Sequence, residues 1–146
     1  MKFISSSYDP ESGISTVIMQ HMGVKFTGTA KLHPVEKERG SKYAGCSYAE
    51  MRATILALKY EREIAKKEAD ACLNFVKSLE CYSKFNKEED SAKSVYRLLN
   101  KRIKRVNDIT DKINFTMHQL QTAIKNREIV TKAITRKKQM KNDKID

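Results

Sequence analysis

The sequence predicts an α+β fold, in which an N-terminal antiparallel sheet of about three strands precedes a long antiparallel two-helix hairpin. Three observations support this prediction. Residues 2–34 alternate β-branched or aromatic runs with clusters of turn-forming residues. No Pro or Gly follows Gly45, so neither of the usual helix breakers interrupts the rest of the chain. Apolar residues recur at spacings of three and four from residue 51 to residue 124, as on one face of a helix.

Residues 1–34 are expected to form a β-meander. The segment Asp9-Pro10-Glu11-Ser12-Gly13 consists of residues that favour turns, and His21-Met22-Gly23 is a second short turn. Pro34 ends the third strand. Because these connections are short, consecutive strands should pair antiparallel. Three strands are only marginally stable in water, so we expect the sheet to pack against another element.

The first helix is predicted over residues 47–82, after a loop over residues 35–46. Ser47 can cap this helix, and Glu50 three residues later completes a capping box. The apolar positions behind it form a heptad seam with one charged member, Arg62. At 1.5 Å per residue the helix should be roughly 50 Å long. The seam consists of Met51, Ile55, Leu58, Arg62, Ala65, Ala69, Cys72, Val76 and Leu79.

The second helix is predicted over residues 91–136, with Asp90 or Ser91 as its cap and a polar turn around Asn86 before it. Residues 137–146 are charged enough that we expect a frayed basic tail. The seam continues along this helix at Val95, Leu99, Arg102, Val106, Thr110, Ile113, Met117, Leu120 and Ile124.

A hairpin with its turn near Asn86 places the two charged seam residues opposite acids. Arg62 should lie near Asp108 or Asp111, and Arg102 near Asp70. The alternative, that both arginines contact a ligand, stays open. A two-helix hairpin also leaves much of its apolar stripe uncovered, so we expect a homo-oligomer, a dimer or a larger assembly.

The positive charge of the chain is concentrated in its last two-fifths. Residues 91–146 carry 15 of the 29 Lys and Arg but only 5 of the 18 Asp and Glu, which is +10 of the net +11. Such a charge attracts anions. The expected partner is therefore a nucleotide, a nucleic acid or an acidic protein surface.

The sequence contains no recognisable catalytic, metal or membrane motif. No Gly-rich phosphate loop, HExxH or GxSxG occurs, so we expect no enzyme activity, no cofactor and no metal. The apolar runs are too short to cross a membrane. Three cysteines without a CxxC are typical of free thiols in a reducing cytosol.

Aromatic and cationic side chains cluster around the helical turn, and this cluster is the main candidate binding site. Tyr82 and Phe85 lie beside Asn86, while Arg97, Lys101, Arg102 and Arg105 lie early in the second helix. Rings can stack on a base, an amide can read its edge, and guanidinium groups can bind phosphate. The same residues also suit a helical core and a solvated helix face. A second candidate is the basic C-terminal segment, which could bind phosphate backbones or serve only solubility.

Three stretches resemble small proteins from phages of Gram-positive bacteria, most closely the Thoeris anti-defence sponge family. The stretches are Phe26-Thr27-Gly28-Thr29-Ala30-Lys31-Leu32-His33-Pro34, Gly45-Cys46-Ser47-Tyr48-Ala49-Glu50-Met51-Arg52-Ala53 and the two long helices that follow. The resemblance covers the architecture of the whole chain, but its motifs are not catalytic signatures.

This resemblance implies a non-enzymatic sponge that holds cyclic ADP-ribose isomers intact in the host cytoplasm during infection. It also implies self-assembly, as dimers or hexamers of dimers, and binding of cyclic oligonucleotides by some members. An aromatic ring and arginines would hold the nucleotide. The positions here that match this chemistry are Phe85, Asn86, Arg97, Arg102, Arg105 and Arg52.

Two other functions remain as alternatives to the sponge. The chain could be an anti-CRISPR-like inhibitor, whose basic helices occupy the acidic surface of a host defence complex. It could also be a nucleic-acid-binding accessory protein that uses the second helix and the basic tail. Salt dependence separates the last alternative, because binding to a phosphate backbone weakens steeply as salt rises.

Overall fold

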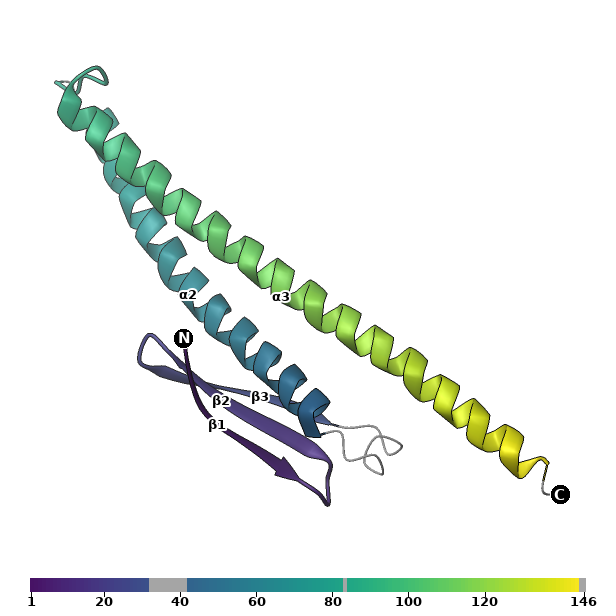
Figure 1. The fold of residues 1–146 in the computed structure, drawn as a ribbon. Coiled ribbons are helices and arrows are strands. Elements are labelled where there is room, and N and C mark those ends of the chain that lie inside the picture. The colour runs from purple at the N-terminus through teal and green to yellow at the C-terminus, as the bar shows by residue number, and fades with distance from the viewer. Residues whose placement is uncertain (32–41, 83, 145–146) are drawn as a thin grey trace. The chain divides into compact units, whose positions relative to one another are not determined.

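The computed structural model describes residues 1–31, 42–82 and 84–144 of the chain. Within these residues, three strands precede two long helices (Figure 1), which confirms the α+β fold class and the order of its elements. The strands are β1 (Lys2–Asp9), β2 (Ile14–His21) and β3 (Val24–Lys31), and the helices are α2 (Lys42–Glu80) and α3 (Asp90–Asn142).

The sheet is an antiparallel meander with the strand order β1-β2-β3, as predicted. Asp9 organises the first turn: its carboxylate accepts hydrogen bonds from the Glu11 amide at 3.0 Å and from the Ser12 hydroxyl at 2.7 Å. The second turn has only two residues between paired strands, Met22 and Gly23, both with positive φ. This backbone matches the twist of the strands it joins. Both turns therefore lie where the turn-forming residues predicted them.

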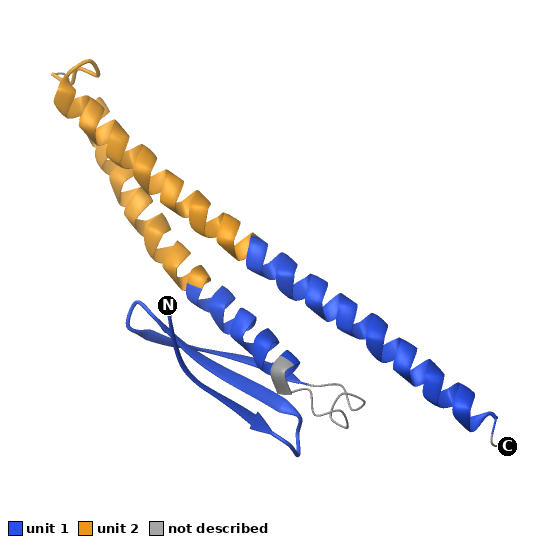
Figure 2. Ribbon diagram, viewed as in Figure 1, with its two compact units in different colours: residues 1–57, 115–146 blue, residues 58–114 orange. Residues whose placement is uncertain are grey.

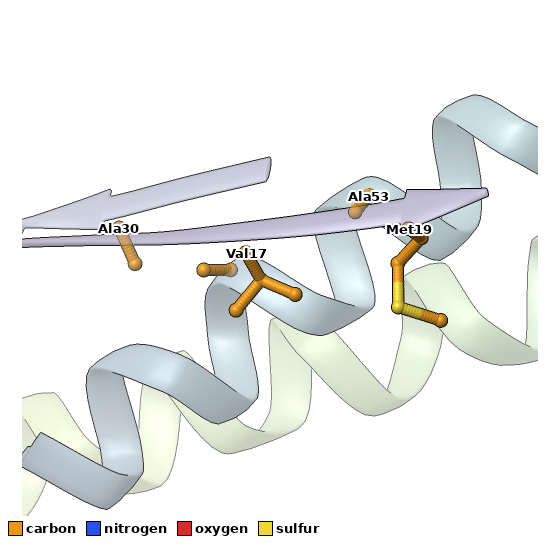
Figure 3. Close-up of a cluster of buried hydrophobic side chains, with 5 residues drawn as sticks. Val17, Met19, Ala30 and Ala53 are labelled. Carbon is orange, nitrogen blue, oxygen red and sulfur yellow. The ribbon is translucent and has the colours of Figure 1, made fainter. Parts of the chain in front are cut away.

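The sheet buries one face against the start of α2. Val17 and Met19 of β2 and Ala30 of β3 form a cluster with Ala49 and Ala53 of α2 (Figure 3). These residues alternate along their strands, so they point to the same face of the sheet. The two fully buried residues that the helix supplies are alanines, which allows its backbone to approach the sheet closely, and Cys46 and Tyr48 pack against the cluster.

The chain divides into two compact units (Figure 2). Unit 1 contains Met1–Ala57 and Phe115–Asp146, and unit 2 is the helical hairpin Leu58–Asn114. In unit 1, the Tyr48 hydroxyl of α2 donates a hydrogen bond to the Ala123 carbonyl of α3 at 3.2 Å. This bond links the two helices within unit 1.

The predicted heptad seam is confirmed along both helices. Each of its positions from Met51 to Leu79 and from Val95 to Ile124 is buried or half-buried. Ile109, which the seam pattern passed over in favour of its neighbour Thr110, is 3% exposed. The hairpin core is therefore slightly wider than a strict heptad seam.

The ends of the predicted helices need correction. The Ser47 capping box is wrong, because α2 begins five residues earlier at Lys42 and passes through Gly45. A glycine inside a helix costs about 1 kcal/mol relative to alanine, which is small enough for tertiary packing to override. Residues 42–46 of the predicted loop are thus helical, whereas residues 35–41 lie outside the described residues. The first helix also ends at Glu80 rather than at residue 82.

The frayed tail is also corrected in part. Helix α3 begins at Asp90 and continues to Asn142, six residues beyond the predicted end. Lys, Gln and Met fill five of the six positions of this extension, and all three are good helix formers. The high charge of these residues suggested that the helix would end before them. Their helix propensity instead extends α3 to Asn142.

Candidate functional site

The predicted site residues occupy three separate places. Arg52 lies near the start of α2 in unit 1. The other six belong to unit 2, where Tyr82, Phe85 and Asn86 lie in the turn between the helices. The remaining three, Arg97, Arg102 and Arg105, lie along the first part of α3.

Arg52 fastens α2 to the sheet. Its Nη1 donates a hydrogen bond to the carbonyl oxygen of Thr29 in β3 at 2.6 Å. Since β3 is an edge strand, this bond satisfies a carbonyl at the open edge of the sheet. The arrangement gives Arg52 a structural role.

Of the aromatic residues in the turn, Phe85 packs on Tyr96 of α3. The rings of Phe85 and Tyr96 lie 6.3 Å apart between centroids with a tilt of 57°, a favourable aromatic geometry. The Asn86 side chain accepts a hydrogen bond from the Glu88 amide at 3.0 Å, which shapes the turn. The ring of Phe85 is half-buried, whereas the ring of Tyr82 is largely exposed, at 61%.

The turn also joins the ends of the two helices. The Tyr96 hydroxyl donates a hydrogen bond to Oε1 of Glu80. This bond to a carboxylate, with burial and charge repulsion as smaller causes, raises the pKa of Tyr96 above its ordinary value. The contact closes the hairpin where α2 ends and α3 begins.

A basic groove runs along α3 within unit 2. It has a volume of about 480 Å³ and combines five cations with two acids and two apolar side chains. Leu98, Lys101, Arg105, Ile109 and Lys112 follow one another at spacings of three and four, so they share one face of the helix. The groove is lined by Glu61, Leu98, Lys101, Arg102, Lys104, Arg105, Asp108, Ile109 and Lys112.

Glu68 of α2 holds the two groove arginines. One oxygen, Oε2, accepts hydrogen bonds from Nη1 of Arg102 and from Nη1 of Arg105, each at 2.8 Å. Nη2 of Arg105 also lies 3.7 Å from Oε1 of Glu61. Because all of these side chains are partly exposed, each ion pair stabilises the hairpin by at most about 1 kcal/mol.

The predicted partners of the seam arginines are corrected by these contacts. Arg102 does meet an acid, but the acid is Glu68 rather than Asp70. Two residues along a helix correspond to a rotation of about 200°, which places Asp70 on the far side of α2. Arg62 makes no salt bridge to any residue that the structure describes, and its Nε is buried without a hydrogen-bond partner.

The turn residues Tyr82, Phe85 and Asn86 do not line the groove, so the turn and the groove do not form one site on a single chain. Arg105 follows Tyr96 by nine residues, about two and a half helical turns, so these two side chains leave α3 on opposite sides. Arg97 is exposed and does not line the groove. The predicted cluster around the turn included Arg102 and Arg105, which line the groove together, but it did not include Leu98, Lys104, Ile109 or Lys112. The spacing of Lys101, Arg105 and Lys112 was the signal that could have found this face.

The groove can bind anions through its cations and an apolar surface through Leu98, which is exposed, whereas Ile109 is buried at its base. In the described part of the chain, no group of three His, Cys, Asp or Glu side chains could hold a metal ion. The three cysteines are free thiols. None of the described helices is long and apolar enough to cross a membrane.

Comparisons with protein-family models, curated protein sequences and solved structures found no match.

Proposed function

We propose that this protein binds a doubly phosphorylated cyclic nucleotide and sequesters it without degrading it. The observation that carries this proposal is the basic groove, which five cations line together with the exposed side chain of Leu98. A nucleotide of this kind offers two phosphates to the cations and a flat apolar surface to the exposed side chain of Leu98. The resemblance to the phage sponge family implies the same ligand class, the cyclic ADP-ribose isomers, and a function in the cytosol of an infected bacterium.

The proposal includes self-association, so that a second copy covers the open side of the groove. Exposed apolar side chains on the part of α3 that belongs to unit 2 support it, among them Leu98 at 46% and Ile103 at 44%. Enclosing most of a small ligand usually requires such a cover. Light scattering on the purified protein measures the assembly directly, and a monomer at working concentration would contradict this part of the proposal.

Thermal unfolding with and without a glycocyclic ADP-ribose tests the proposed function. A ligand at a thousand times its Kd adds about 4 kcal/mol to the free energy of unfolding. In a chain of this length we expect Tm to rise by about 10 °C or more. Nucleotide recovered intact after heat denaturation would separate sequestration from hydrolysis.

Two arginine variants provide the matched controls. Arg105→Gln removes a groove cation and should greatly reduce the shift. Arg97→Gln removes the same charge from the same helix outside the groove and should leave most of the shift in place. If ligand-free protein shows no shift with cyclic ADP-ribose isomers or cyclic oligonucleotides, the sponge function is wrong.

A nucleic-acid-binding role is the second candidate, and the length of α3 favours it. Residues 125–142 remain helical and carry seven Lys or Arg against one Glu. A rigid basic helix can follow a phosphate backbone without reading its sequence. This candidate depends on a part of α3 that does not line the groove.

A further inference from the structure

Glu68 stands out because a single carboxylate oxygen holds both groove arginines. Oε2 receives Nη1 of Arg102 and Nη1 of Arg105 at the same distance, 2.8 Å. Arg102 and Arg105 line the groove, whereas Glu68 does not. The carboxylate therefore holds two guanidinium groups at the groove without itself belonging to its lining.

This geometry leaves most of the hydrogen-bonding capacity of the arginines available. A guanidinium carries five N–H donors, and each hydrogen bond to Glu68 uses one nitrogen, Nη1. The Nη2 of Arg105 is near Glu61, but 3.7 Å is an ion-pair distance and too long for a hydrogen bond. Donors on both arginines can thus still reach a phosphate oxygen.

Holding the arginines in advance should favour binding. An arginine side chain has many rotamers, and fixing one of them when a ligand arrives opposes association. Glu68 restricts both side chains in the free protein. The same carboxylate also has an unfavourable effect, because its negative charge partly cancels the attraction that the cations exert on an anion.

We propose that Glu68 is a positioning residue of the anion groove, which orients Arg102 and Arg105 for phosphate. The proposal rests on the proposed function, in that the groove must bind a phosphorylated ligand. Glu68 could affect anion binding by positioning the two arginines or through its negative charge. These two effects predict different affinities for two variants. Glu68→Asp keeps the charge but shortens the side chain by one methylene, so that one carboxylate can no longer reach both arginines. Glu68→Gln removes the charge but keeps an oxygen that can accept both hydrogen bonds.

Calorimetric titration with pyrophosphate, below the unfolding transition of every variant, tests this proposal. We expect Glu68→Asp to bind roughly tenfold more weakly than the wild type, because two side chains must then be ordered on binding. Glu68→Gln should bind at least as tightly as the wild type. Asp108→Asn is the matched control, since Asp108 lines the groove and has no hydrogen bond or ion pair with either arginine. Asp108→Asn should bind pyrophosphate more tightly than the wild type, because it removes a negative charge without changing the contacts of either arginine.

The outcomes separate this proposal from the proposed function. Equal affinity of Glu68→Asp and the wild type would overturn positioning and leave Glu68 as a counter-ion only. Absence of pyrophosphate binding to the wild type would overturn it too, even if a glycocyclic ADP-ribose still raised Tm. The expected order of affinities without any nucleotide-induced shift would support positioning by Glu68 and reject only the cyclic nucleotide as the ligand.

Discussion

Gly28 sets how closely α2 approaches the sheet. A Cβ at this position would lie 1.9 Å from the carbonyl oxygen of Ala49 and 2.6 Å from the amide nitrogen of Ala53. Both are backbone atoms of the helix, so no side-chain rotation could relieve the overlap. The small residues on the two faces, Gly28 and Ala30 against Ala49 and Ala53, therefore act together.

We expect Gly28→Ala to destabilise the protein by about 3 kcal/mol or more, toward or beyond the upper end of typical overpacking costs. Urea unfolding of the wild type and the variant measures the difference. Adding Ala49→Gly should not rescue the variant, since the overlap involves the Ala49 carbonyl and not its methyl group.

Gly23→Ala is the comparison that separates crowding from backbone strain. Nothing lies within 4 Å of a Cβ at Gly23, but its φ is +77°. Alanine there should cost only about 1–2 kcal/mol from the left-handed backbone. A Gly28→Ala variant no less stable than Gly23→Ala would show that α2 can move away from the sheet at little cost.

At the scale of elements, the sequence predicted which face of each helix is buried more accurately than it predicted the first and last residues of the helix. The spacing of apolar residues identified the buried side of both helices, because burial of that side is what selects such residues. The ends depend on weaker local effects. Ser47 and Glu50 form a capping pattern, yet α2 begins at Lys42 and the pattern lies inside the helix. The capping pattern alone does not show whether the residues before Ser47 gain enough from packing to be helical as well.

The contact of Tyr96 with Glu80 makes the hairpin end sensitive to high pH. The folded-state pKa of Tyr96 is raised, chiefly by its hydrogen bond to the Glu80 carboxylate. A raised pKa means that this contact stabilises the fold fully below the unfolded-state value of about 10, and that the stabilisation is lost as pH rises through the folded-state value.

We therefore expect Tyr96→Phe to have a lower Tm than the wild type near neutral pH, and the difference to shrink as pH rises above about 10. Unfolding curves at a series of pH values provide the measurement. Glu80→Gln should move the tyrosinate absorbance of Tyr96 toward lower pH. A Tm difference that stays constant with pH would show that Tyr96 acts through ring packing on Phe85 alone.

At the scale of the whole molecule, the sequence predicted the fold class because each element carries its own periodic pattern. The site was harder to predict, since it depends on side-chain partners across the hairpin. The register was within two residues of the observed contact for Arg102, but that offset rotates a helix position by about 200° and changes the partner from Asp70 to Glu68. The presence of aromatic and cationic residues near the turn could not show that Phe85 packs on Tyr96.

Deletion of residues 137–146 decides between nucleotide capture and binding along a phosphate backbone. The deleted segment belongs to unit 1 and holds Lys137, Lys138, Lys141 and Lys144, whereas every residue that lines the groove belongs to unit 2.

If the protein captures a nucleotide, the truncated chain should keep the Tm increase produced by a glycocyclic ADP-ribose. If it binds duplex DNA instead, each lysine that contacts a phosphate contributes about −0.9 to the slope of log affinity against log salt. Fluorescence anisotropy with a labelled duplex at several salt concentrations should then show weaker binding and a shallower slope after truncation. Loss of the nucleotide-induced shift in a truncated protein that remains folded would place the ligand on the C-terminal part of α3, and the groove would no longer be the nucleotide site.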